Sequence, residues 1–193
     1  MNLRANDFEL FDLPVRFEQT VADIDTRWKA LQRQAHPDRS MAQGDAAQRL
    51  AMQWSLRINE AYRRLSDPLR RAAYLCELHG VPVETRDGAL LAPDVLEQQM
   101  HWHEVLENGP TEAELTRLEA DVRVAAHEQQ RACARLLDQE HDGRGAAACV
   151  RAWMFTRRLA QQIADVRAAR IDASSGLAGD RTVDGEPRAS AVR

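Results

Sequence analysis

Three residues that could take part in chemistry stand together at positions 36–38, where the sequence reads His-Pro-Asp. Pro37 has no backbone N–H and a fixed φ, and it disfavours helical geometry in His36, so a helix that reaches this point must end. The side chains of His36 and Asp38 are then expected to project from a rigid turn, where the carboxylate could pair with a basic group of a partner. By itself the tripeptide favours an ordinary exposed turn, so the elements around it decide its meaning.

The segment before this turn predicts an amphipathic helix over residues 17–34. Lys29 and Arg33 lie opposite its apolar side, and with Arg39 beyond the turn they would make a positive surface. The apolar residues recur at steps of three and four and predict one buried stripe, made of Val21, Ile24, Trp28 and Leu31.

The segment after the turn predicts a second long helix beyond a polar connection that contains Gly44. Because the connection is short and each helix needs an apolar surface to pack against, the two helices must be antiparallel neighbours. A shorter helix is expected to restart at Ser66 or Asp67, with Pro68 in its first turn and Gly80 at its end. The buried stripe predicted for the second long helix is Leu50, Trp54, Ile58, Ala61 and Leu65.

The fold class is predicted to be all-α, because the periodicity is helical nearly everywhere and no run alternates long enough to predict a strand. A short helix over residues 7–12 comes first, and Pro14 ends it at Leu13. Residues 81–93 hold two prolines and a glycine without a sustained period, which is typical of a linker. Residues 171–193 are poor in large apolar groups, and we expect a disordered tail there.

Between the linker and this tail, three more helices are predicted to form an antiparallel bundle. The long middle helix carries an apolar stripe of Leu115, Leu118, Val122, Ala125, Cys133 and Leu136. The expected limits are 94–108 with Asp94 as the cap, a helix that starts at a capping box of Thr111 and Glu114, and 146–169 after the turn at 142–145.

The composition excludes several classes of function for these 193 residues. A net charge of −4 gives no electrostatic basis for binding nucleic acid or an anionic membrane. No apolar stretch approaches the roughly 20 residues that span a bilayer, and the N-terminus lacks the apolar core of a signal peptide. We therefore expect a cytoplasmic protein. The three cysteines are far apart in the sequence and predict buried reduced thiols.

The turn and its neighbours together resemble a J domain over residues 7–80. The resemblance depends on the joint match of His-Pro-Asp with INEAY at 58–62, SDP at 66–68 and RAAYL at 71–75. In J domains this loop and the adjoining basic helix dock on a DnaK-type chaperone and trigger hydrolysis of its bound ATP. The resemblance implies a chaperone-binding site made of His36, Pro37, Asp38, Lys29, Arg33 and Arg39.

The layout beyond the J domain resembles one family in particular, the HscB co-chaperones of iron-sulfur cluster assembly. The motifs that carry this likeness are FELFDLPVRF at 8–17, LQRQAHPD at 31–38 and YLCELHG at 74–80, followed by a helical bundle. The resemblance implies an L-shaped molecule that delivers the iron-sulfur scaffold protein to a DnaK/HscA-type chaperone. Its parts would be a J domain at 1–80, a linker at 81–93, a three-helix scaffold-binding bundle at 94–170 and the tail at 171–193.

The scaffold-binding positions of the family correspond here to Leu96, Met100, Glu104 and Phe155. The chain departs from the family pattern at Glu97, which replaces a usually apolar residue, and at His101, which replaces a usually acidic one. An alternative is that Leu96, Met100 and Phe155 belong to the core, and Phe155 fits a stripe with Ala152, Leu159, Ile163 and Val166.

Other readings of the sequence remain open. A J-domain co-chaperone with a different client would share every motif except the scaffold surface. A metal- or cluster-binding protein could use His101, His103 and the cysteines, although residues i and i+2 of a helix do not face one another. A helical nucleic-acid binder is disfavoured by the charge. No P-loop, dinucleotide fingerprint or nucleophile elbow is present, so we expect no cofactor, no metal and no catalysis by the chain itself.

Overall fold

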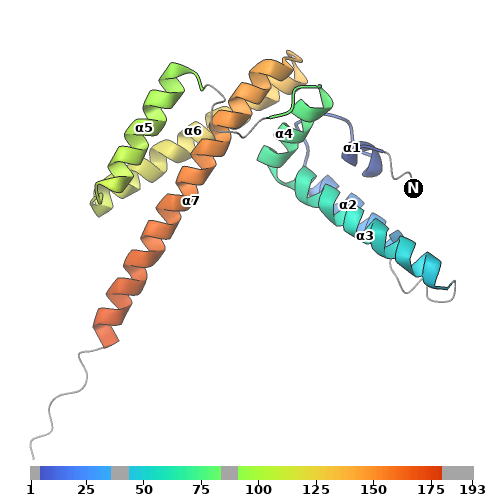
Figure 1. Ribbon diagram of the computed structural model, residues 1–193, viewed down its shortest axis with the longest axis horizontal. Coiled ribbons are helices and arrows are strands. Elements are labelled where there is room, and N and C mark those ends of the chain that lie inside the picture. The colour runs from blue at the N-terminus through green and yellow to red at the C-terminus, as the bar shows by residue number, and fades with distance from the viewer. Residues whose placement is uncertain (1–4, 36–43, 84–90, 180–193) are drawn as a thin grey trace, which may run out of the picture.

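The computed structural model describes residues 5–35, 44–83 and 91–179, with side chains as far as residue 173. In these residues every regular element is a helix, which confirms the all-α prediction. Figure 1 shows two arms that meet at an angle, one built from α2 and α3 and the other from α5, α6 and α7, with α4 at the junction. The helices are α1 (Asp7–Leu10), α2 (Val21–Ala35), α3 (Asp45–Ser66), α4 (Pro68–Leu78), α5 (Pro93–Glu107), α6 (Glu112–Asp138) and α7 (Gly143–Gly179).

The first arm is a pair of helices packed side by side, as predicted. Ile24 of α2 and Ile58 of α3 are fully buried. The rings of Trp28 and Tyr62 lie 4.9 Å apart between centroids, and the indole Nε1 of Trp28 donates to Oδ1 of Asn59 at 3.1 Å. Aromatic contacts and a satisfied indole N–H fix the register of the two helices.

Two residues of the predicted stripes are exposed instead. Val21 is 61% exposed and Leu50 is 48% exposed. Val21 is the first residue of α2, at the end of the helix pair. On α3, Ala51 is buried in place of the predicted Leu50. Neighbouring residues of a helix are rotated by about 100° about its axis, so the side chain of Leu50 points away from the interface. Helical periodicity gives the face of a helix but not the length over which a partner covers it.

The start of α2 also differs from the prediction, which placed it near residue 17. Phe17 is buried, and its amide donates to Oδ1 of Asp138 at 2.6 Å, while the amide of Glu18 donates to Oδ2 at 2.9 Å. A carboxylate of α6 therefore holds this segment outside a helix, and the helix begins at Val21.

The short helix α1 is docked on α3 through a buried carboxylate. Asp7 is fully buried, and its oxygens lie 2.5 Å from Arg57 and 3.0 Å from Arg64. The backbone amide of Asp7 donates to the hydroxyl of Tyr74 in α4 at 3.0 Å. A buried charge with two basic partners orients α1 against both neighbouring helices.

The limits of α4 are those predicted. Oδ1 of Asp67 accepts from the amides of Leu69 and Arg70 at 2.9 and 3.1 Å, and Pro68 occupies the first turn. At the other end Gly80 has a φ of +75°, a backbone conformation that favours glycine and closes the helix.

The second arm differs from the prediction at three helix ends. Because Pro93 opens α5, its N-cap is Ala92 and Asp94 lies inside the first turn. Helix α7 begins at Gly143, since Oδ1 of Asp142 accepts from the amides of residues 144 and 145 at 3.1 and 2.9 Å. It also continues to Gly179, so the expected tail does not start at residue 171. The remainder of that tail, 180–193, lies outside the described residues.

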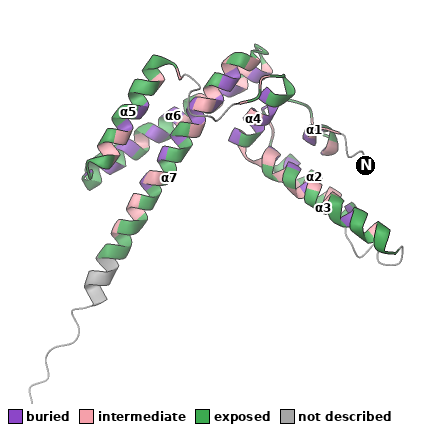
Figure 2. Ribbon diagram, viewed as in Figure 1, coloured by how far each residue is buried: buried purple, intermediate pink, exposed green. Residues whose placement is uncertain are grey.

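The two arms share one apolar core at their junction. Figure 2 shows buried residues of α4 facing those of α6 and α7. Leu75 and Cys76 from α4 cluster there with Cys133, Val150 and other residues of α6 and α7. In the sequence, the predicted linker separates these two groups of residues. A second, smaller core lies within the bundle and consists of Trp102, Leu115, Leu118, Val122, Ala125, Leu159 and Ile163. The arms are thus joined by packing as well as by the chain.

Candidate functional site

The basic face predicted on α2 is present. Lys29 and Arg33 are both exposed and lie four residues apart, hence on one line of the helix. Next to this line, Gln32 donates to Oδ1 of Asn59 at 2.6 Å, which anchors α2 to α3. Helix α2 ends at Ala35, directly before the predicted turn.

The turn itself lies outside the described residues. His36, Pro37, Asp38 and Arg39 all fall in the segment 36–43. The end of α2 and the start of α3, which flank this segment in the sequence, lie at the far end of the first arm, away from the junction with α4 (Figure 1). The roles assigned to these four residues stay predictions.

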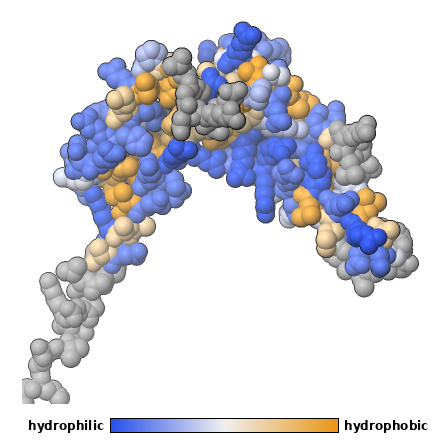
Figure 3. Space-filling model, in the orientation of Figure 1, coloured by the Kyte–Doolittle hydropathy of each residue, from blue (hydrophilic) through white to orange (hydrophobic). Residues whose placement is uncertain are grey.

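The surface predicted on the bundle consists of exposed side chains. Leu96 is 48% exposed, Met100 is 64% exposed and Phe155 is 41% exposed, and Glu104 is exposed as well. The alternative that the three apolar residues belong to the core is therefore wrong. Figure 3 shows apolar surface along the arm that contains α5 and α7. Exposed apolar groups that gather on a packed bundle are typical of a binding surface.

One buried hydroxyl brings the two parts of this surface together. Thr156 is fully buried, and its Oγ1 accepts from Nε2 of Gln99 at 3.2 Å and from Nε2 of Gln129 at 3.0 Å. The same hydroxyl donates to the carbonyl of Ala152 at 3.1 Å. Gln99 stands between Leu96 and Met100 on α5, and Thr156 follows Phe155 on α7. This cluster was not predicted from the sequence, although a threonine in the apolar stripe of α7 was a signal for it.

A charged side chain lies against the exposed aromatic ring. The guanidinium carbon of Arg158 lies 5.9 Å from the centroid of the Phe155 ring. This distance is at the outer limit of a cation–π contact. The positive charge of Arg158 therefore belongs to the same surface as Phe155.

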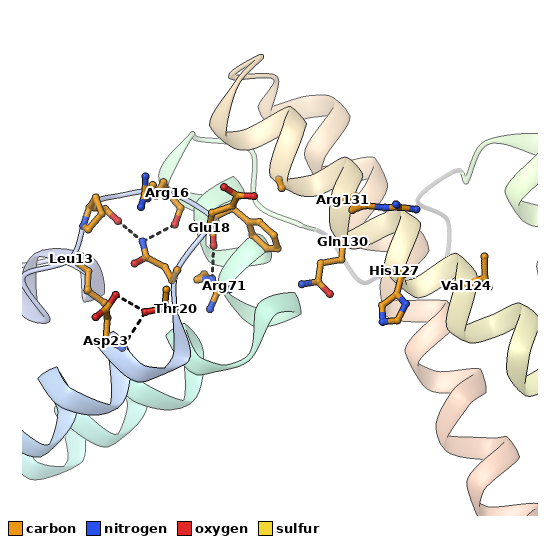
Figure 4. A pocket seen from close by; sticks show the side chains of 14 residues that line it. Leu13, Arg16, Glu18, Thr20, Asp23, Arg71, Val124, His127, Gln130 and Arg131 are labelled. Atoms are coloured by element: carbon orange, nitrogen blue, oxygen red, sulfur yellow. Dashed lines mark hydrogen bonds between the residues drawn. The ribbon is translucent and has the colours of Figure 1, made fainter.

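A groove of about 920 Å³ separates the 14–20 segment from α6, where His127, Gln130 and Arg131 line it, and Figure 4 shows Gln130 pointing toward the segment. Its floor includes Arg71, whose Nε donates to the carbonyl of Phe17 at 2.8 Å. Burial lowers the pKa of the Arg71 guanidinium. Gln19 donates to the carbonyls of Pro14 and Arg16, so these two carbonyls are already paired within the chain. None of the predicted site residues lines this groove.

The metal-binding alternative finds no support in the described part of the chain. Within it no three histidine, cysteine, aspartate or glutamate side chains are grouped so that they could hold a metal ion. His101 is exposed on α5, while the cysteines lie on α4, α6 and α7. Among the helices that are described, none has the length and apolar character to cross a membrane.

Comparison with known proteins gives consistent matches. The family model described as HSCB C-terminal oligomerisation domain matches residues 91–164. The "Co-chaperone protein HscB homolog" of Bordetella petrii is 43% identical over 169 residues, covering 86% of this chain and 99% of that protein. The homolog of Burkholderia mallei is 40% identical over 166 residues, covering 84% of this chain and 94% of that protein.

Two solved structures resemble the whole arrangement. The chaperone HscB from Vibrio cholerae superposes with a TM-score of 0.74 at 31% identity, covering 86% of this chain and 99% of that chain. The human co-chaperone protein HscB superposes with a TM-score of 0.81 at 23% identity, over 86% and 84% of the two chains. Because the identity to the human protein is only 23%, this second match supports the fold alone.

The fold, with its basic helical hairpin joined to a helical bundle, defines a co-chaperone of the J-domain class. The curated relatives are co-chaperones at 39–43% identity over nearly their whole length. The chain belongs to the HscB family of co-chaperones.

Proposed function

We propose that this protein binds an iron-sulfur cluster scaffold protein through α5 and α7 and stimulates the ATPase of a DnaK/HscA-type chaperone through its His-Pro-Asp turn. The observation that carries the proposal is the exposure of Leu96, Met100 and Phe155 on two helices that Thr156 ties together. Membership of the HscB family supports the same pair of partners. The J domain would occupy residues 1–80 and the scaffold-binding bundle residues 94–170.

The scaffold contact is mainly apolar in this proposal. The apolar side chains of Leu96 and Met100 would be buried from solvent on binding, and Phe155 would add a rigid aromatic group to the contact. Glu104 adds a negative charge at one side of the surface. His101 stands where relatives usually have an acid, so we expect less dependence on salt than an acidic patch would give.

The chaperone contact is mainly electrostatic. Lys29 and Arg33 are exposed on α2, and Arg39 follows the turn in the sequence. Their charges would steer the encounter with a negative surface of the chaperone. Asp38 would then pair with a basic group of the chaperone in a charge-assisted hydrogen bond. The chain activates hydrolysis by its partner and catalyses no reaction itself.

Both contacts belong to one molecule, and this defines the mechanism. The bundle holds the scaffold while the turn engages the chaperone, so the scaffold reaches the chaperone at a high effective concentration. Hydrolysis of ATP then traps the scaffold in the substrate site of the chaperone. We expect this exchange to take place in the cytoplasm.

The proposal is tested by measuring the steady-state ATPase of the cognate chaperone with this protein, with and without the scaffold. We expect Asp38→Asn to reduce the stimulated rate at least about tenfold, since an unpaired charge is left at the interface. Scaffold affinity and melting temperature should not change. Asp121→Asn, a change of the same type at an exposed position of α6, should retain full stimulation.

Two outcomes would contradict the proposal in different ways. Full stimulation by Asp38→Asn would remove the role assigned to the turn. Stimulation by the wild-type protein that the scaffold does not enhance, together with no scaffold binding, would indicate a J-domain co-chaperone with a different client.

A further inference from the structure

Two cysteines that are distant in the sequence lie against each other near the junction of the arms. Cys133 of α6 and Cys149 of α7 stand at similar distances along the chain from the turn between these helices, so the antiparallel pairing brings them side by side. Their Sγ atoms are 3.5 Å apart, and both thiols are free. A disulfide needs about 2.05 Å between sulfur atoms, so the two Sγ atoms would have to approach by about 1.5 Å for the bond to form.

The two thiols are not equivalent. Cys133 is fully buried and donates its S–H to Sγ of Cys149, whereas Cys149 is partly exposed. The hydrogen bond from Cys133 lowers the pKa of Cys149 despite the opposing effect of burial, and the charge of Arg135 acts in the same direction. The same hydrogen bond, together with burial, raises the pKa of Cys133. Cys149 is therefore the sulfur that an oxidant reaches and the better nucleophile of the two.

We propose that Cys133 and Cys149 form a peroxide-oxidisable pair that closes into an intramolecular disulfide between α6 and α7. The thiolate of Cys149 attacks one oxygen of hydrogen peroxide, the O–O bond breaks, and the departing hydroxide takes a proton to become water. Cys133 then attacks the sulfenic sulfur of Cys149, the S–O bond breaks, and the hydroxide leaves with the proton of Cys133 as a second water. Two thiols lose two electrons, and one peroxide becomes two waters.

The third cysteine provides an internal control. Cys76 of α4 is fully buried, and burial raises its pKa to about 11. Its thiol is therefore protonated and shielded at neutral pH, and we expect it to stay reduced while the pair reacts.

The full chain is tested after removal of reductant, by adding a small molar excess of hydrogen peroxide. Thiol titration under denaturing conditions should fall from three groups to one, and the intact mass should fall by about two hydrogen masses, as one disulfide forms. Non-reducing peptide mapping should join the peptides of Cys133 and Cys149. Closing a loop of this length should raise the melting temperature by about 5 °C, and dithiothreitol should reverse the shift.

Matched variants separate the pair from the remaining thiol. Cys76→Ser should form the cross-link as the wild type does. Cys133→Ser should form none, and its Cys149 should gain oxygen instead, because the remaining thiol of Cys76 is buried and protonated. Retention of three thiols, oxygen addition to wild-type Cys149 without a cross-link, or cross-links only between molecules would each overturn the proposal. The mapping of the wild-type chain decides this even if a variant does not fold.

Discussion

Thr156 has one hydroxyl proton and two lone pairs to offer, and the structure uses all three. The proton goes to Ala152 of its own helix, and the lone pairs accept from Gln99 of α5 and Gln129 of α6. A buried hydroxyl that is fully satisfied in this way costs little and fixes three helices in register. Phe155 is consequently held at a set position relative to the exposed residues of α5.

The exposed residues of α5 can be tested by a double substitution. We expect Leu96→Ala combined with Met100→Ala to weaken scaffold binding about tenfold or more, because both apolar contacts are truncated. The melting temperature should hardly change, since neither side chain is in the core. Isothermal titration calorimetry with the scaffold measures the effect.

A matched control is available on the other arm. Met52 and Leu56 of α3 are likewise exposed, and changing both to alanine removes a similar amount of exposed apolar surface. That variant should bind the scaffold with wild-type affinity. Equal affinities of both double variants would assign the scaffold contact to another surface.

Arg71 is a second residue with a definable role. Its Nε donates to the carbonyl of Phe17, its Nη1 donates to the carbonyl of Leu65, and its guanidinium lies 5.3 Å from the centroid of the Phe17 ring. We expect Arg71→Met to lower the free energy of unfolding by about 3 kcal/mol, since two buried carbonyls lose their donor. Urea denaturation measures this. Arg131→Met, at an exposed site, serves as the control, and equal midpoints for the two variants would contradict the assignment.

For single residues, the sequence predicts which side of a helix is exposed better than it predicts which residues pack against each other. Lys29 and Arg33 are exposed as the period of α2 requires. Whether Phe155 belonged to the core could not be decided, because its stripe passes through Thr156, and only the structure shows that Thr156 takes the inward place. The residues 36–39 carry the strongest motif of the sequence and stay a prediction.

Among the helices, α4 shows how one carboxylate can serve two elements. Asp67 caps α4 and also lies 2.7 Å from Nη2 of Arg157 on α7. Burial alone would raise the pKa of Asp67, but the hydrogen bonds from Arg157 and from the amides of Arg70 and Leu69 together lower it. The pair connects the start of α4 to the second arm.

The lowered pKa leads to a pH dependence with a definite sign. Because the pKa of Asp67 is lower in the folded state, its contribution to stability is present above the unfolded value of 3.8 and is lost as the pH falls through the folded value. Asp67→Asn keeps a capping side chain but removes the charge. We expect this variant to be less stable than the wild type at pH 7 by about 1 kcal/mol at most, since solvent screens the pair.

The difference between wild type and Asp67→Asn should narrow as the pH falls below 3.8 and should disappear once the wild-type carboxyl is also neutral in the folded protein. Thermal unfolding followed by circular dichroism between pH 3 and 7 measures it. Asp94→Asn, at an exposed position of α5, controls for general acid effects. A gap between the two proteins that does not narrow on acidification would argue against the pairing with Arg157.

Helix ends were predictable where the signal is local. The capping box of Thr111 and Glu114 and the positions of Pro68 and Gly80 were read from the sequence and are found in the structure. The start of α2 was missed, although Thr20 caps it locally by accepting from the amide of Asp23 at 3.2 Å. The contact of Asp138 with the amides of Phe17 and Glu18, more than a hundred residues away, could not be predicted. The extension of α7 was missed since adding a turn to an existing helix costs much less than starting one.

In the whole molecule, the angle between the arms depends on contacts that no linker analysis could reveal. Val150 and Trp153 of α7 pack with α4 in one core, and Asp138 holds the amides of Phe17 and Glu18. The L shape followed from the family resemblance, whereas the sequence between 81 and 93 predicted only a linker. A shared core instead gives each arm a fixed position relative to the other.

The proposed mechanism requires both contacts in one molecule whose arms are joined, and it can be tested by mixing two proteins that each lack one contact. One carries Asp38→Asn and an intact scaffold surface, and the other carries Leu96→Ala with Met100→Ala and an intact turn. If delivery depends on both contacts in one molecule, an equimolar mixture should not restore the part of the ATPase rate that depends on the scaffold. The rate should stay near that of the second variant alone, because the effective concentration comes from the covalent connection. Recovery to half or more of the wild-type rate would mean that the arms act independently and that the rigid junction has no part in delivery.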